Sequence, residues 1–212
     1  MKKGLFITFE GNDGSGKTTI SKLVYEKMEA LGYPVIYTRE PGGIEIAEQI
    51  RSIILDPKNT NMDSKTEALL YAASRRQHLI EKVIPALEKG YIVLCDRFVD
   101  SSLAYQGYAR KLGISEIYEL NQFAIDGHMP DATIFLELSA EEGLKRIEDR
   151  PNKDRLDQEG LDFHYAVSEG YRQVKEKYQE RMMIVDASQS MEKVLHQAFC
   201  IVLDLVKINE ER

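Results

Sequence analysis

The stretch LFITFEGNDGSGKT, residues 5–18, decides the fold of this chain. Residues 5–9 form a short apolar run typical of a buried strand, and a stretch with helical periodicity begins at Lys17. Between them, residues 11–18 match the pattern G-x-x-x-x-G-K-[ST], in which a glycine-rich loop joins a strand to a helix. A chance match in a glycine-rich turn is the alternative, but such a turn needs no strand before it and no helix after it. The stretch therefore predicts a phosphate-binding loop, or P-loop.

Each residue type in this loop has a physical task. Gly11, Gly14 and Gly16 permit backbone torsions and close approaches that a Cβ atom would block, so successive N–H groups can point at phosphate oxygens. Lys17 supplies a compact cation for the β and γ phosphates, and Thr18 offers a hydroxyl to Mg²⁺. We therefore expect a nucleoside triphosphate to bind through Gly11, Asn12, Asp13, Gly14, Ser15, Gly16, Lys17, Thr18 and Thr19.

Short apolar runs alternate with amphipathic stretches along the whole chain. The expected strands are residues 5–9, 35–38, 91–95, 133–138 and 183–186, and the expected helices are residues 17–31, 44–55, 64–89, 114–125, 140–148, 161–181 and 191–208. Strands that alternate with helices favour right-handed crossovers and a parallel sheet covered on both faces. The sequence thus predicts a three-layer α/β P-loop NTPase fold with a five-stranded parallel sheet, in a single domain that spans residues 1–212.

Composition excludes several other classes of protein. The 212 residues carry a formal net charge of −7, whereas a nucleic-acid binder needs a surplus of Lys and Arg on one face. The two cysteines, Cys95 and Cys200, have neither zinc-site nor disulfide spacing, which fits a reducing compartment. No apolar run approaches the length of a signal peptide's core or of a membrane span. We expect a cytoplasmic protein with no nucleic-acid or membrane partner.

A second candidate site element follows the strand predicted at residues 91–95. Asp96 sits where a carboxylate beside the P-loop strand usually steadies Mg²⁺, so Thr18 and Asp96 are the expected metal residues. The alternative is that Asp96 caps a helix or forms a turn. Arg97 follows directly, and its guanidinium fork matches the geometry of a phosphate group.

The segment RPNKDRLDQEG, residues 150–160, is dense in both charges and lies between two expected helices. It could be a solvated surface loop, as most runs of charge are, or a lid that brings cations over a phosphate. Its composition alone leaves these two interpretations open.

Several further motifs follow the P-loop in a fixed order. They are TREPGG at residues 38–43, YAASRR at 71–76, DRF at 96–98 continuing to SLAYQG at 102–107, PD at 130–131, and DRLD at 154–157. With these motifs the chain resembles, over essentially its whole length, the bacterial thymidylate kinases of the nucleoside-monophosphate kinase superfamily. The resemblance implies an ATP- and Mg²⁺-dependent enzyme that phosphorylates dTMP to dTDP, and it implies a homodimer.

The same resemblance implies roles on the acceptor side. Arg39, Arg51 and Arg97 would hold the acceptor phosphate, Tyr71 would stack on thymine where the family usually has Phe, and Arg75 would donate to thymine O4. Ser102 and Gln106 would contact the rest of the base edge, Tyr105 would crowd the sugar C2′ position, and Asp13 would accept from the 3′-hydroxyl. Each of these residues also has an ordinary alternative, because a helical Tyr can be core and a helical Arg can be a solvated charge.

Phosphoryl transfer depends on positioning and on cations that offset the repulsion between two polyanions. An acceptor phosphate is already anionic and needs no general base. In some family members a catalytic arginine follows the P-loop aspartate; here that position is Gly14, which implies that the arginines come from the lid, approximately residues 149–160. The expected catalytic residues are Lys17, Arg97, Arg150, Arg155 and Asp13.

Two other functions remain as alternatives. A deoxynucleoside kinase, or another small-molecule kinase on the same fold, would phosphorylate a hydroxyl and would need Asp13 or Asp96 as a base. A non-enzymatic P-loop protein that binds a partner would have no use for Tyr71, Arg75 and Gln106.

Overall fold

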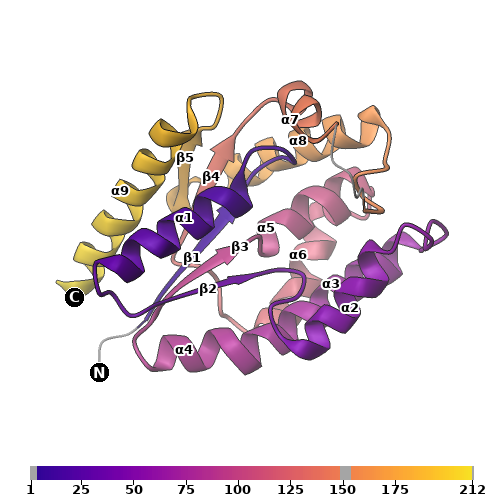
Figure 1. Cartoon of the computed structure of the whole chain (residues 1–212). Coiled ribbons are helices and arrows are strands. Elements are labelled where there is room, and N and C mark those ends of the chain that lie inside the picture. The colour runs from indigo at the N-terminus through magenta and orange to yellow at the C-terminus, as the bar shows by residue number, and fades with distance from the viewer. Residues whose placement is uncertain (1–3, 149–153, 212) are drawn as a thin grey trace.

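The computed structural model describes residues 4–148 and 154–211, and its centre is a five-stranded parallel sheet (Figure 1). The strands are β1 (Leu5–Glu10), β2 (Val35–Arg39), β3 (Ile92–Asp96), β4 (Ala132–Glu137) and β5 (Met182–Asp186). Their spatial order is β2-β3-β1-β4-β5, so β1 lies in the middle of the sheet. This arrangement confirms the predicted α/β fold with an all-parallel sheet.

Helices cover both faces of the sheet. On one face lie α1 (Lys17–Ala30) and α9 (Met191–Glu210), which pack Val24, Met28 and Val202 against the odd-numbered residues of β1 (Figure 1). The other face is covered by elements that contribute to a second core with Phe6 of β1. They are α3 (Ser64–His78), η1 (Leu79–Val83), α4 (Ile84–Glu88), α5 (Val99–Ser102), η2 (Leu103–Ala109), α6 (Ile114–Ile125) and α8 (Leu161–Lys177).

Three remaining elements complete the described chain. They are α2 (Glu45–Leu55), which packs on α3, α7 (Ala140–Ile147) and the short 3-10 turn η3 (Gln179–Arg181). No helix in the described ranges 4–148 and 154–211 is both long and apolar enough to cross a membrane.

The strand register brings polar residues to one edge of the sheet. Phe9 pairs with Asp96 between β1 and β3, and Arg39 pairs with the same Asp96 between β2 and β3. The carboxyl ends of β1, β2 and β3 therefore lie side by side. Since the P-loop follows β1 directly, it lies next to the residues that follow β3.

The expected strands agree with the observed ones to within one residue at each end, but the helices differ from expectation in three places. The helix expected over residues 161–181 ends at Lys177, and Gln179–Arg181 form the separate turn η3. The helix expected over residues 64–89 is divided into α3, the π-helical η1 and α4. Pro85 lies in the first turn of α4; it has no N–H to donate to the preceding turn, and such a gap favours a local π-helical turn. The helical segment α5–η2 was not predicted at all.

The P-loop packs unusually closely on α7. A Cβ atom at Gly143 would overlap the backbone oxygen of Asp13, and a Cβ atom at Gly14 would overlap the backbone of Gly143. Both positions therefore need glycine for a steric reason, and at Gly14 the φ angle of 78° adds a conformational one.

We predict that Gly143→Ala destabilises the protein, although alanine is the better helix former by about 1 kcal/mol. The added methyl group must push α7 away from the loop, at a cost of about 1–3 kcal/mol as in other overpacked cores. Thermal or denaturant unfolding measures this, with Lys145→Ala, at an exposed position of the same helix, as control. A Gly143→Ala variant as stable as the wild type would contradict the close contact.

Candidate active site

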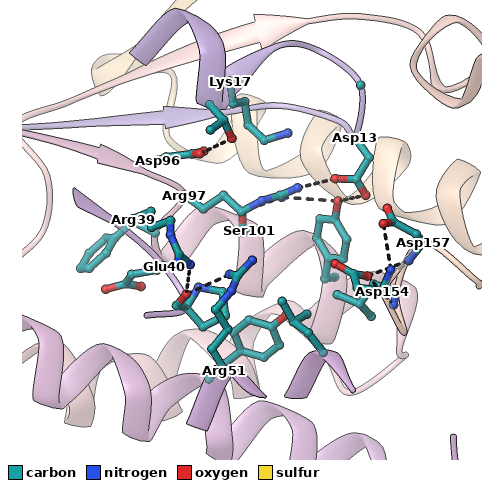
Figure 2. Close-up of a pocket in the computed structure, with 18 of the residues that line it drawn as sticks. Asp13, Lys17, Arg39, Glu40, Arg51, Asp96, Arg97, Ser101, Asp154 and Asp157 are labelled. Carbon is teal, nitrogen blue, oxygen red and sulfur yellow. Dashed lines mark hydrogen bonds and ion pairs between the residues drawn. The ribbon is translucent and has the colours of Figure 1, made fainter. Parts of the chain in front are cut away.

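A cavity of about 360 Å³ opens at the carboxyl edge of the sheet (Figure 2). Its lining comes from the P-loop and α1, from the ends of β2 and β3, and from α2, α3, α5, η2 and the segment after residue 153. The residues are Asp13, Gly14, Gly16, Lys17, Thr18, Thr19, Lys22, Arg39, Glu40, Pro41, Arg51, Leu55, Tyr71, Arg75, Asp96, Arg97, Phe98, Ser101, Tyr105, Gln106, Asp154, Leu156 and Asp157.

The P-loop curls around the side chain of Lys17. Its Nζ donates to the backbone oxygens of Gly11 at 2.8 Å and Asn12 at 2.7 Å. Gly11, Gly14 and Gly16 all have positive φ angles, which glycine adopts readily. Burial, together with repulsion from Arg97, lowers the pKa of Lys17 to about 8. The site thus holds a buried cation that an anionic ligand would stabilise.

Thr18 and Asp96 form the part of the cavity that suits a divalent cation. Thr18 Oγ1 donates to Asp96 Oδ2 at 2.5 Å. The other carboxylate oxygen, Asp96 Oδ1, is buried and has no hydrogen-bond partner within the described part of the chain. A hydroxyl and a carboxylate beside a phosphate loop are the oxygen ligands that Mg²⁺ takes, directly or through water. These residues fit the ion.

Arg97 lies at the centre of the cavity and points toward Asp13 (Figure 2). It forms an ion pair with Asp13, and Tyr105 Oη donates to the second carboxylate oxygen of Asp13 at 2.7 Å. Burial alone would raise the pKa of Asp13, but the positive charges of Arg97 and Lys17 outweigh it and hold the pKa well below its usual range. Asp13 is therefore ionised at neutral pH and is a weak base.

A buried glutamate, Glu10, fixes the turn that carries Arg97. Glu10, the last residue of β1, accepts from the backbone N–H of Phe98 at 2.7 Å and from Ser101 Oγ at 2.6 Å. Burial and the nearby charge of Asp100 raise the pKa of Glu10 to about 7. The contacts fix the turn on which Arg97 sits with a φ angle of 69°, a conformation that few non-glycine residues adopt.

Two further arginines meet on the other side of Arg97 (Figure 2). Arg39 Nη1 and Arg51 Nη1 both donate to the backbone oxygen of Pro41, at 3.0 and 2.9 Å. Arg39 is also held by Glu48 through two hydrogen bonds. Three guanidinium groups, from β2, α2 and the end of β3, therefore converge on one cavity, which suits a second phosphate group.

The innermost end of the cavity is built around a buried arginine. Arg75 donates to Glu40 Oε2 at 2.7 Å, to the backbone oxygen of Phe98 at 3.0 Å and to Ser102 Oγ at 3.1 Å. Its remaining partner is Asn121. Tyr71 and Gln106 line the same cavity. A fixed cationic donor in a cavity that also presents an aromatic ring and an amide can recognise a flat heterocycle by its polar edge.

The structure brings most of the predicted residues to the cavity but places others differently. Ser102 is buried behind Arg75 and contacts its guanidinium, so it supports the arginine instead of lining the cavity. Asn12 donates from Nδ2 to the backbone oxygen of Leu138 and to Ser168 Oγ at 2.8 Å each, on the far side of the loop. Any contact of Asn12 with phosphate would use its backbone.

The two lid arginines have different outcomes. Arg150 lies outside the described residues. Arg155 was expected to reach over the donor phosphates, but the structure places it elsewhere: it is buried, with Nη2 donating to Glu67 at 2.5 Å and Nε to the backbone oxygen of Ile54 at 2.8 Å. A buried carboxylate needs a cationic partner, and Arg155 fills that need. Its catalytic role stays a prediction without support from this geometry.

Sequence reasoning missed several residues that shape the site. Glu10, Glu40, Glu67 and Asn121 are buried polar residues whose partners lie on other elements. Glu40 stands in the TREPGG motif and Glu10 directly precedes the P-loop, so both could have been suspected. Glu67 and Asn121 carry no local signal, because their arginine partners are 43 or more positions away.

One cavity at the carboxyl edge of the parallel sheet thus combines four features. They are a P-loop suited to a polyphosphate, a Thr18–Asp96 pair suited to a divalent cation, a cluster of arginines, and a recess at Arg75 suited to a base. This combination defines a P-loop phosphotransferase that acts on a nucleotide.

Comparisons with known proteins agree with that class. A family model described as "Thymidylate kinase" matches residues 9–198. A thymidylate kinase of Bacillus pumilus (strain SAFR-032) is 58% identical over 98% of this chain and 99% of its own length, and one of Clostridium novyi (strain NT) is 55% identical over 93% and 97%. The crystal structure of thymidylate kinase from Ehrlichia chaffeensis superposes with a TM-score of 0.77 at 33% identity, covering 95% of this chain and 99% of that one. The chain therefore belongs to the thymidylate kinase family.

We predict that ATP binding takes up a proton at alkaline pH. In the free protein Lys17, with a pKa of about 8, is largely neutral at pH 9, whereas bound phosphates favour its charged form. Binding should therefore take up a fraction of a proton at pH 9 and weaken as pH rises above 8, with no contribution from Lys17 at pH 6.5.

Isothermal titration calorimetry in buffers of different ionisation enthalpy measures this uptake. The Lys27→Met variant, which changes a cation at an exposed position of the same helix, should retain it. Absence of uptake at pH 9 in the wild type would show that Lys17 is not the depressed cation.

Proposed function

We propose that this protein transfers the γ-phosphoryl group of ATP to the phosphate of dTMP and so forms dTDP and ADP. The observation that carries the proposal is a single cavity lined by the P-loop, Arg97 and Arg75, in which Arg97 pairs with Asp13 of the P-loop and Arg75 donates to the backbone oxygen of Phe98, the residue after Arg97. That order matches a donor triphosphate, an acceptor phosphate and an acceptor base.

Mg²⁺ is part of this proposal. Thr18 and Asp96 would hold it, directly or through water, and Asp96 Oδ1 has no other hydrogen-bond partner within the described residues. Bound there, the ion would supply positive charge that offsets the negative charge of the phosphate groups.

The protein's own residues would do the rest by positioning and by charge. Lys17 would contact the β and γ phosphates, and Arg97 would bridge the acceptor phosphate and the transferred group. Because the attacking oxygen belongs to a phosphate, no base has to remove a proton. A reaction that needs no general base agrees with the low pKa of Asp13, which makes this carboxylate unsuited to accept a proton at pH 7.

The acceptor base would occupy the recess between Tyr71 and Arg75. Arg75 keeps its orientation through Glu40, Ser102 and the Phe98 oxygen, so it presents donors in a fixed direction. Thymine O4 would accept a hydrogen bond from Arg75. Cytosine carries an amino group at C4 instead, so two hydrogen-bond donors, this amino group and the guanidinium of Arg75, would face each other. Tyr105 and Asp13, which line the cavity and both contact Arg97, would lie against the sugar. We further propose that residues 1–212 form one P-loop kinase domain, with a lid at approximately residues 149–160.

We also propose that the protein works as a homodimer in the cytoplasm, where ATP and deoxynucleotides are available. The packed helices α3 and α6 carry Leu69 and Phe123, whose exposed fractions are 57% and 90%, and Ile80 in the adjoining η1 is 47% exposed. Apolar side chains exposed to this degree on adjoining elements suit a self-complementary interface with a second copy of the chain.

An acceptor panel tests the proposed reaction. With MgATP as donor we expect kcat/KM to be highest for dTMP and about 10–200-fold lower for dUMP, which lacks one methyl group. Transfer to dCMP should be weaker still, and thymidine should not be phosphorylated. Preference for thymidine over dTMP would instead establish a deoxynucleoside kinase.

The dimer has its own test. Phe123→Glu should convert a dimer into monomers in sedimentation experiments, because burying two uncompensated carboxylates at the interface is costly. Leu31→Glu, at an exposed apolar residue after α1, serves as the matched control and should leave the dimer intact. A wild-type protein that sediments as a monomer at micromolar concentration would contradict the proposal.

A further inference from the structure

Glu67 lies in the first turn of α3 and is fully buried, yet the proposed reaction gives it no part. Its carboxylate is the meeting point of three donors from two other regions of the chain. Gln106 Nε2, from η2, donates to Oε1 at 2.8 Å. Arg110 donates to both oxygens at 3.3 and 3.2 Å, and Arg155 donates to Oε2 at 2.5 Å.

The contact with Gln106 decides how that amide is turned. An ionised carboxylate can only accept hydrogen bonds, so the NH₂ end of the amide must face it. Arg110 and Arg155, which likewise can only donate, form ion pairs with the same carboxylate. Since Gln106 also lines the cavity, the carbonyl end of its amide is the end left to meet an acceptor base.

The same carboxylate ties this orientation to the segment after residue 153. Arg155 is fixed to the end of α2 by two more hydrogen bonds, from its backbone N to Leu55 O at 3.1 Å and from Nε to Ile54 O at 2.8 Å. Arg110 also donates to Glu159 at 2.5 Å. Leu156, between these anchors, lines the cavity. Glu67 therefore links the segment that carries Leu156 to the side-chain amide of Gln106, and both line the recess.

The direction of the amide matters for base selection. Thymine carries a hydrogen-bond donor at N3, whereas cytosine carries an acceptor there. An amide fixed with its oxygen toward the base accepts from the first and is repelled by the second. A site whose polar groups are held in one orientation discriminates more strongly than one whose groups can turn over.

We propose that Glu67 is a positioning residue that sets which end of the Gln106 amide faces the acceptor base, and so contributes to selection of thymine over cytosine. The inference rests on the proposed dTMP kinase function. Glu67 acts through Gln106 and touches no substrate.

The test is the Glu67→Gln variant, which keeps the shape of the side chain. Arg110 and Arg155 then claim its one acceptor oxygen, and its NH₂ group faces Gln106, which turns over. We expect the ratio of kcat/KM for dTMP over dCMP to fall at least about tenfold. The KM for dTMP should rise more than kcat falls.

A double-mutant cycle with Gln106→Met separates positioning from general damage. If Glu67 acts through the amide, Glu67→Gln should no longer change the dTMP/dCMP ratio once the amide is absent. Glu159→Gln, which removes only the outer partner of Arg110, should leave the ratio unchanged. If Glu67→Gln does not fold, Glu67→Asp is measured in the same way. The shorter side chain keeps a carboxylate for Arg110 and Arg155 but moves it out of hydrogen-bond distance of Gln106.

Two results would overturn the inference: an unchanged ratio in the folded variant, or the same change of ratio in the Gln106→Met background. Neither result touches the proposed function, which the wild-type acceptor panel decides separately. A wild-type protein that does not phosphorylate dTMP would end the proposed function and this inference together.

Discussion

The ion pair between Asp13 and Arg97 joins the two halves of the site. Asp13 belongs to the loop after β1 and Arg97 to the turn after β3, and the pairing of Phe9 with Asp96 brings these turns together. Arg97, Lys17 and the hydrogen bond from Tyr105 offset the cost of burying Asp13, and Asp13, Ser101 and Tyr105 offset the cost of burying Arg97. A change in the sheet register would break this pairing and separate the donor half from the acceptor half.

Around this pair, buried acids hold cations in place. Glu10 fixes the turn that carries Arg97, Glu40 holds Arg75, and Glu67 holds Arg155 and Arg110. Arg97 and Arg75 are thus held in one orientation by buried acids, and cations fixed in this way can stabilise a spread of negative charge without reorganising. The chain as a whole is acidic, with a net charge of −7, but its cavity gathers Lys17 and four arginines. Binding of two polyanions depends on that local concentration of positive charge.

The sheet and the P-loop follow from local sequence pattern. The strand expectations agree with the structure to within one residue because a buried strand in a parallel sheet is a short apolar run that stands out between amphipathic helices. The helix over residues 99–109 was missed because its inward side chains include Ser102, Tyr105 and Gln106, which interrupt an apolar stripe. The placement of Arg155 was also missed, since a charged loop gives no sign that one of its arginines is needed by a buried carboxylate 88 positions away.

The sequence by itself determined the order of strands and helices, the phosphate loop and the family, because these depend on residues that are neighbours along the chain. It also named most of the residues that line the cavity. Only the tertiary structure decided which cations face the cavity and which serve as partners for buried acids. Arg75 and Arg155 both bond to buried glutamates, yet only Arg75 lines the cavity. The reason is that a buried charge takes the partner that the fold brings within hydrogen-bond distance, and that distance is set by packing between elements far apart in sequence.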